Sequence, residues 1–359
     1  MSRKPDKPLR KGWTTGACAT AATRAAYDAL LTGAFSDPVS IILPKGEQPS
    51  FALAHLLLGD GHAEAAVVKD AGDDPDVTHG ATVMARVALA PAGSGVVFRA
   101  GEGVGTVTLP GLPVAVGEPA INPAPRAMMI AQIEALAAAH GAPGDVEITI
   151  SVAGGEALAA KTWNPRLGIV GGLSILGTTG VVIPYSCSAW IHSIHSGIDV
   201  ARATGCGHVA GATGKTSEAA VKALYGLDDT ALLDMGDFAG GMLKYLRRNP
   251  VPRVTIAGGF GKLTKLAQGA LDLHSSRSQV DFGRLAEALA DLGAAPDVVA
   301  RAQGANTAME VLGLATVLPI ADVIARQARE VALATLAGDI AVDVVVFDRQ
   351  GKLIGHAGP

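Results

Sequence analysis

The chain has 359 residues, which is long enough for two ordinary domains with well-buried cores. Its net charge of −4 and its aromatic content of 4% provide neither the positive surface nor the stacking side chains that nucleic-acid binding needs, so we expect no nucleic-acid partner. It contains 45 glycines against about 25 at the usual share, so the backbone must approach other backbone or a ligand closely at many points.

Cysteine content and apolar stretches bear on the location of the protein. Its cysteines, Cys18, Cys187 and Cys206, are too few and too far apart for a disulfide framework, so we expect a reducing cytoplasm. No unbroken apolar run follows the basic N-terminus, which predicts a frayed tail around Arg3 to Lys11 rather than a secretory signal. Residues 167–191 lack Asp, Glu, Lys and Arg, but glycines and Pro184 interrupt them, so we expect no membrane span.

The first predicted helix, Cys18–Leu31, follows Thr14, Thr15 and Gly16 directly. Its alanines recur at helical spacing, which predicts a closely packed face. A Thr or Gly at a helix start leaves backbone N–H groups facing outward, where they suit a carboxylate or phosphate. The alternative is an ordinary capped helix with no ligand.

An α+β domain with a mixed or antiparallel sheet is predicted for residues 1–165. Beyond the first helix, its elements are one further helix, Pro125–His140, and five strands, Val39–Leu43, Ala65–Lys69, Thr82–Leu89, Val96–Arg99 and Val146–Val152. The turn Ala153–Glu156 is expected to close a hairpin. A segment rich in Gly and Pro, residues 166–188, is predicted to join this domain to the next.

Residues 189–359 alternate strands with helices, which predicts an α/β domain with a mainly parallel sheet. The helices are Ala189–Thr204, Ser217–Tyr225, Phe238–Arg248 and Lys262–Ala270; the strands are Gly207–Ala212, Ala231–Met235 and Val251–Ala257. A closing hairpin is expected from Val342–Phe347 and Leu353–Gly355. Ligands of parallel sheets bind at the carboxyl ends of the strands.

The turn 211–216 imitates a phosphate-binding P-loop but has Val209 where that motif requires glycine, which argues against ATP or GTP. A glycine turn after the first parallel strand, followed by an acidic residue after the second, is a common way to hold an adenosyl group. Asp234 and Asp237 are the acidic candidates, with a helix N-cap as the alternative role. The cofactor-binding residues predicted in this domain are Gly211, Thr213, Gly214, Asp234, Asp237, Gly258 and Gly259.

We expect no bound metal ion. The acidic loop 70–76 lacks the spacing of a calcium-binding EF-hand, because Gly72 and Pro75 fall at the wrong places. Cys187, His192, His195, Cys206 and His208 follow no recognised zinc spacing.

Five blocks in order resemble the CbiD family of cobalamin biosynthesis, the cobalt-precorrin-5B C1-methyltransferases. They are Lys69–Gly80, Gly103–Leu112, Gly117–Arg126, Asn164–Gly180 and Ile256–Leu266, and the resemblance runs from about Leu9 to the end of the chain. It implies methyl transfer from S-adenosylmethionine to ring carbon C1 of cobalt-precorrin-5B, giving cobalt-precorrin-6A in the anaerobic pathway, with cobalt carried by the substrate.

The macrocycle that the resemblance implies is fringed with carboxylates, which guanidinium groups match best. Candidate substrate-binding residues are Thr14, Thr15, Gly16, Asn122, Arg126, Asn164 and Arg166. His274 and Asp73 are the candidates for moving a proton, although a satisfied polar role is the alternative for His274. We expect the active site in the cleft between the domains.

Two other functions stay open on the sequence. A non-catalytic tetrapyrrole carrier would bind the corrinoid without a cofactor, and a nucleotide-dependent ligase would require ATP. Beyond the corrinoid substrate, a homo-oligomer or transient contacts with neighbouring pathway enzymes are the partners expected.

Overall fold

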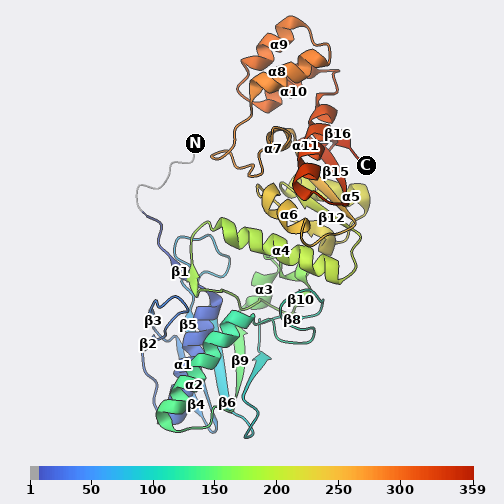
Figure 1. The fold of residues 1–359 in the computed structure, drawn as a ribbon. Coiled ribbons are helices and arrows are strands. Elements are labelled where there is room, and N and C mark those ends of the chain that lie inside the picture. Colours follow the sequence, from blue (N-terminus) through green and yellow to red (C-terminus); the bar gives the residue numbers. More distant parts are fainter. Residues whose placement is uncertain (1–7) are drawn as a thin grey trace. The chain divides into compact units, whose positions relative to one another are not determined.

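The computed structural model describes residues 8–359. The expected frayed tail lies outside this range up to residue 7, and the prediction is wrong for Arg10, which bonds to Asp70 and Asp73. The chain divides into two compact units, one ending at Ser186 and the other running from Cys187 to Pro359 (Figure 1). The segment predicted to join the domains contributes strands β10 (Ile169–Val170) and β11 (Val181–Val182) to the first unit. No helix in the described part of the chain is both long and apolar enough to cross a membrane.

The first unit is an α+β domain, as predicted. Its main sheet has the order β4-β5-β6-β9-β7, antiparallel except for the parallel pair β7 and β9. The strands are β4 (His55–Gly59), β5 (His62–Val68), β6 (Thr82–Leu89), β7 (Val96–Ala100) and β9 (Val146–Val152). Short antiparallel pairs surround it: β1 (Gly12–Trp13) with β11, β2 (Val39–Ser40) with β3 (Ser50–Phe51), and β8 (Thr106–Val107) with β10.

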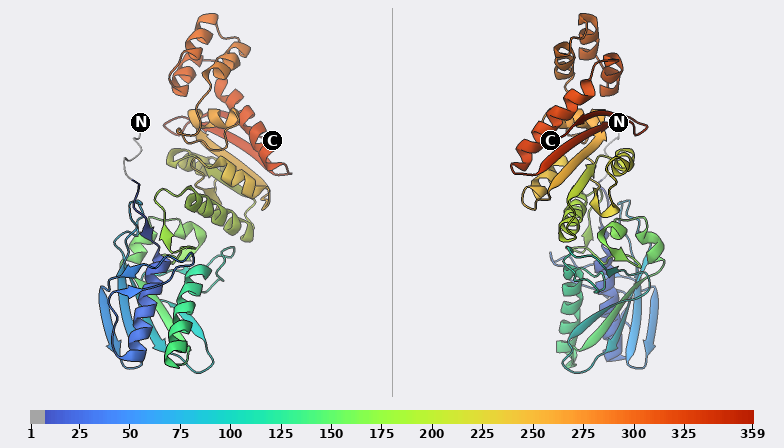
Figure 2. Two further views of the ribbon diagram at one scale, coloured as in Figure 1. Left: turned by 60° about the vertical axis from the view of Figure 1, so that its left-hand side comes forward. Right: turned by 90° about the vertical axis from the view of Figure 1, so that its right-hand side faces the viewer.

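Two long helices, α1 (Thr15–Thr32) and α2 (Pro123–His140), pack side by side on one face of this sheet (Figure 2). The alanines of α1 are fully buried, and they meet small side chains such as Ala63, Ala65 and Ala85 on the strands. Small residues on both surfaces let the helix lie close to the sheet. The other face carries polar pairs, including Arg86 and Glu64, whose Nε and Oε1 atoms lie 3.6 Å apart.

The hairpin predicted at Ala153–Glu156 is wrong. Strand β9 already has β6 on one side and β7 on the other, so no edge is left for a further strand. Gly154 adopts a left-handed conformation with φ of 65°, and the chain turns into the short helix α3 (Gly155–Ala159). A 3₁₀ helix follows at Asn164–Leu167.

The second unit is the predicted α/β domain, with the strand order β13-β12-β14-β15-β16. The first four strands are parallel and β16 is antiparallel, so the closing hairpin is confirmed. Their bounds are β12 (His208–Ala212), β13 (Leu232–Leu233), β14 (Arg253–Gly259), β15 (Ala341–Phe347) and β16 (Leu353–Ala357). A 3₁₀ helix, Asp229–Ala231, leads into β13.

Helices cover both faces of this sheet. On one face, α5 (Lys215–Tyr225) covers a small core that includes Ala210, Ala257 and Val345. The larger core on the other face includes Val254 and Ile256 and is closed by α4 (Cys187–Ala203), α6 (Ala239–Leu246), α7 (Phe260–Ala267) and α11 (Ile320–Leu336). Helices α8 (Phe282–Asp291), α9 (Pro296–Gln303) and α10 (Ala308–Ala315) extend that larger core, and these three helices and α11 were not predicted.

Candidate functional site

The start of α1 is bonded within the first unit. Thr14 is the N-cap, and its hydroxyl accepts from the N–H of Ala17 at 3.1 Å. The N–H of Gly16 donates to the carbonyl of Leu176 at 3.0 Å, and the N–H of Leu176 donates to the Thr15 hydroxyl at 3.2 Å. The prediction of outward-facing N–H groups is therefore wrong for Gly16 and Ala17, because both already have partners in the chain.

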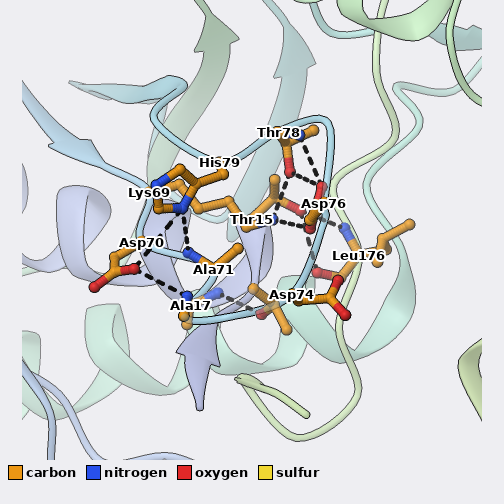
Figure 3. A network of polar contacts seen from close by, with 12 residues as sticks. Thr15, Ala17, Lys69, Asp70, Ala71, Asp74, Asp76, Thr78, His79 and Leu176 are labelled. Carbon is orange, nitrogen blue, oxygen red and sulfur yellow. Dashed lines mark hydrogen bonds and ion pairs between the residues drawn. The ribbon is translucent and has the colours of Figure 1, made fainter. Parts of the chain in front are cut away.

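The acidic loop after β5 surrounds a buried lysine (Figure 3). The Lys69 side chain is 2% exposed and forms an ion pair with Asp76 and a hydrogen bond with the Thr78 hydroxyl. Burial raises the pKa of Asp76, but the attraction of Lys69 and the surrounding hydrogen bonds outweigh it, so the pKa lies below its ordinary value. A buried charge needs such a partner, and this pair fixes the shape of the loop.

The same loop is fastened to the segment before α1. Asp73 accepts a hydrogen bond from the backbone N–H of Arg10 at 2.6 Å, and the Arg10 guanidinium pairs with Asp70. The hydrogen bond from Arg10 holds the pKa of Asp70 at about 2. A Cβ on Gly12 would lie 2.0 Å from the carbonyl carbon of Ala71, so the two backbones touch. Asp73, predicted to move a proton, thus anchors this loop from an exposed position.

Arg126 and Asn164, predicted to bind substrate, bond to loops of the first unit. The guanidinium of Arg126 donates to the carbonyls of Ile121 at 2.8 Å and Pro119 at 3.1 Å, and it reaches Glu118 at 3.2 Å. Asn164 is buried, donates to the carbonyl of Gly172 and accepts from the hydroxyl of Ser174. These contacts account for both residue types without a ligand.

Asn122 and Arg166 were the other two polar candidates. Asn122 is the N-cap of α2, and its backbone N–H donates to the carbonyl of Ile175 at 2.9 Å. The guanidinium carbon of Arg166 lies 4.7 Å from the ring centroid of Trp163, within the range of a cation–π contact.

The second unit brings Thr213, Gly214, Asp237, Gly258 and Gly259, five of the predicted cofactor residues, to one edge of its sheet. Strand β12 connects to β13 on one side and β14 connects to β15 on the other, so the chain diverges after these two neighbouring strands. Such a switch point is where ligands bind in parallel sheets with this strand order. Thr213 and Gly214 follow β12, Gly258 and Gly259 end β14, and a Cβ on Gly258 would lie 2.9 Å from the Thr213 side chain.

Two helices begin at this edge. Gly214 is the N-cap of α5 and Gly259 is the N-cap of α7, and both glycines are exposed. A Cβ on Gly214 would meet no atom within 4 Å, and one on Gly259 would meet only the carbonyl oxygen of Phe347 at 4.0 Å. Packing within the chain does not explain these glycines, whereas the positive ends of two helices suit an anionic group.

Asp237 and Lys262 form the polar centre of the edge. The Lys262 amine donates to the carbonyl of Thr213 at 2.9 Å and lies 3.0 Å from Asp237 Oδ1. That carboxylate oxygen is buried, and among the described residues it has no hydrogen-bond partner of acceptable geometry. The backbone N–H of Leu273 donates to the carbonyl of Asp237 at 2.8 Å, which holds the loop of His274 beside it.

Three further predicted residues, Gly211, Asp234 and His274, make contacts that do not involve the Asp237–Lys262 pair. Gly211 lies inside β12, where a Cβ would be 2.3 Å from the Met242 sulfur, so packing explains this glycine. The carbonyl of Asp234 accepts from the indole N–H of Trp190, and His274 is exposed with its Nδ1 2.7 Å from the Ser276 hydroxyl. Within residues 8–359, no three His, Cys, Asp or Glu side chains are grouped so as to hold a metal ion.

Sequence reasoning missed Lys69, Lys262 and Trp190. The two lysines stand in blocks that carry the family resemblance, Lys69–Gly80 and Ile256–Leu266, and a charge inside such a block is the signal that could have found them. Nothing near Trp190 in the sequence connects it with Asp234, which lies 44 residues away.

Comparisons with known proteins agree with the resemblance. The sequence model of the CbiD family matches residues 2–184, and that of the CbiD C-terminal domain matches residues 272–358. The cobalt-precorrin-5B C(1)-methyltransferase of Brucella canis is 64% identical over 99% of this chain and 98% of its own length. That of Paramagnetospirillum magneticum is 63% identical over 98% of this chain and 99% of its own. The crystal structure of the cobalamin biosynthesis protein CbiD from Archaeoglobus fulgidus has 27% identity and a TM-score of 0.40, covering 75% of this chain and 83% of that one.

With nearly two thirds of its residues shared with these relatives along almost its whole length, this chain belongs to the CbiD family.

Proposed function

We propose that this chain is a cobalt-precorrin-5B C1-methyltransferase that uses S-adenosylmethionine and yields cobalt-precorrin-6A. The observation that carries the proposal is the near full-length identity of 64% with a relative that bears this enzyme name. The corrinoid is then the substrate, and its cobalt belongs to that substrate.

The switch point of the second unit fits S-adenosylmethionine. Oδ1 of Asp237 is paired with Lys262, the side chain is 22% exposed, and a ribose hydroxyl would donate to this carboxylate. The N-termini of α5 and α7 would hold the carboxylate of the methionine portion. The exposed Gly214 and Gly259 leave room for close approach of a ligand to the backbone.

The chain's task in this reaction is placement rather than strong acid–base chemistry. S-adenosylmethionine supplies a methyl group on a sulfonium, which is already a good leaving group. Lys262 bonds to the Thr213 carbonyl and pairs with Asp237, so it fixes the two loops between which the cofactor would lie. His274, in the neighbouring loop, is the residue we propose as the proton acceptor of the step. Holding the reacting atoms in line and excluding water account for the rate gain.

Replacing Asp237 with Asn tests the cofactor site. We expect the binding free energy of S-adenosylhomocysteine to become less favourable by about 1–3 kcal/mol, because the ribose loses a charged acceptor. Isothermal titration calorimetry measures it. Asp229→Asn, which removes an exposed carboxylate paired with Lys222 in the same unit, is the matched control and should bind as the unaltered protein does.

The same titrations separate the rival functions. Binding of the corrinoid without S-adenosylhomocysteine would identify a carrier, and a requirement for ATP would identify a ligase. Equal affinity in Asp237→Asn and the unaltered protein would move the cofactor away from this edge.

A further inference from the structure

Trp190 is a large aromatic side chain that is 44% exposed although it is held in place. It lies near the start of α4, and its indole N–H donates to the carbonyl of Asp234 at 2.9 Å. Its ring centroid is 6.3 Å from that of Phe238, with the planes inclined at 53°. An exposed indole with a bonded N–H and an aromatic neighbour has lost most of its conformational freedom before any ligand arrives.

The turn beneath the indole belongs to the switch point. Gly236 has a φ of 55°, a left-handed conformation that favours glycine, and a Cβ there would lie 3.4 Å from the indole ring. The N–H of Gly236 donates to the carbonyl of Ala212, the last residue of β12, at 2.9 Å. Trp190 therefore stands over the turn that also carries Asp237.

We propose that Trp190 is the surface on which the adenine ring of S-adenosylmethionine stacks. This inference rests on the proposed function and on Asp237 as the ribose ligand. The base is joined directly to the ribose, so a sugar bound at Asp237 places the base within reach of the side chains around the turn 234–238. Trp190 offers an exposed aromatic face there, and stacking on an aromatic face needs no polar group on the base.

A structural role for Trp190 would have a different signature. If the indole only secured the turn through its hydrogen bond to Asp234, replacement by Phe would be as damaging as replacement by Ala. A stacking role depends on the aromatic face, which Phe retains.

The experiment compares Trp190→Phe and Trp190→Ala by calorimetric titration with S-adenosylhomocysteine, after circular dichroism has established that each variant is folded. We expect Trp190→Ala to lose affinity roughly tenfold or more, the range for one stacked base, and Trp190→Phe to keep most of it. Trp163→Phe, in the first unit, is the control and should bind normally.

Fluorescence supplies a second readout. With Trp13 and Trp163 replaced by Phe, Trp190 is the remaining tryptophan, and S-adenosylhomocysteine should quench its emission as the purine covers the indole. Unchanged affinity in Trp190→Ala, equal losses in the Phe and Ala variants, or unquenched emission at saturating ligand would each overturn the stacking role alone. Failure of the unaltered protein to bind S-adenosylhomocysteine would overturn the proposed function, and the stacking role with it.

Discussion

The role of Arg126 depends on its partners, because an arginine at this place could bind a substrate carboxylate or stabilise a loop. Its place after Asn122 and two prolines predicts a guanidinium aimed at a substrate carboxylate. In the structure this group bonds to two carbonyls and to Glu118, and it lies 5.2 Å from the Phe98 ring centroid. Most N–H groups of this guanidinium already have partners within the chain, which indicates that Arg126 stabilises the loop 117–122.

We therefore expect Arg126→Lys to lower the free energy of unfolding by about 1–2 kcal/mol, because an ammonium cannot reproduce the fork of contacts. Urea denaturation measures it. Arg99→Lys is the control, since Arg99 forms an exposed pair with Glu147 that should contribute little. Normal stability combined with lost corrinoid turnover would return Arg126 to the substrate site.

At the scale of the element, the start of α1 depends on Thr14. Its hydroxyl caps the helix. A Cβ on Gly177 would lie 2.4 Å from the Thr14 side chain, so Thr14 also packs against the backbone of Gly177. Thr14 was predicted as a substrate ligand, whereas its hydroxyl is used in the cap and its side chain is buried. Capping is thus the role that the contacts of Thr14 support.

Replacing Thr14 with Ala should cost about 1 kcal/mol of stability, while Thr14→Ser should lose much less because it keeps the capping oxygen. Thermal unfolding of both variants tests this. The control is Thr32→Ala at the other end of α1, where the exposed hydroxyl donates to the carbonyls of Asp28 and Ala34 and accepts from the N–H of Ala34 at 3.4 Å. Equal losses in the Ser and Ala variants would mean that packing of the methyl group, rather than the cap, makes the contribution.

At the scale of the whole molecule, the hydrophobic cores fall into separate sets. Every buried residue of the clusters around α1 and around β8 belongs to the first unit, and every buried residue of the two clusters on the parallel sheet belongs to the second. Cooperative unfolding follows shared cores, so each unit should unfold as a body.

We expect two calorimetric transitions. S-adenosylhomocysteine should raise the midpoint temperature of only one of them, that of the second unit. A ligand present at about 100 times its dissociation constant stabilises the unit that binds it by about 2.7 kcal/mol. Asp237→Asn should remove that shift under the same conditions, whereas Asp229→Asn should retain it. A single transition with equal calorimetric and van't Hoff enthalpies would contradict the independence of the two units.

Local patterns in the sequence determined much of the secondary structure. The alternating apolar residues of Thr82–Leu89 and Val146–Val152 predicted β6 and β9 at their observed bounds, since the period of a half-buried strand is visible in a single segment. The alternation of strands and helices predicted the parallel sheet of the second unit, because a helix between two strands is the usual connection between parallel neighbours. The order of the five motif blocks indicated the family, because a resemblance in sequence does not require knowing which residues touch.

The tertiary structure alone decided which residues share a site. The strand order places the loops after β12 and β14 beside each other although 45 residues separate Thr213 from Gly258, and it brings Lys262 to Asp237 and Trp190 to Asp234. It also showed that Arg126, Asn164 and Asp73 use their polar groups within the first unit. Such pairings depend on which strands become neighbours and on which donors find partners inside the fold, and periodicity along one segment carries information about neither.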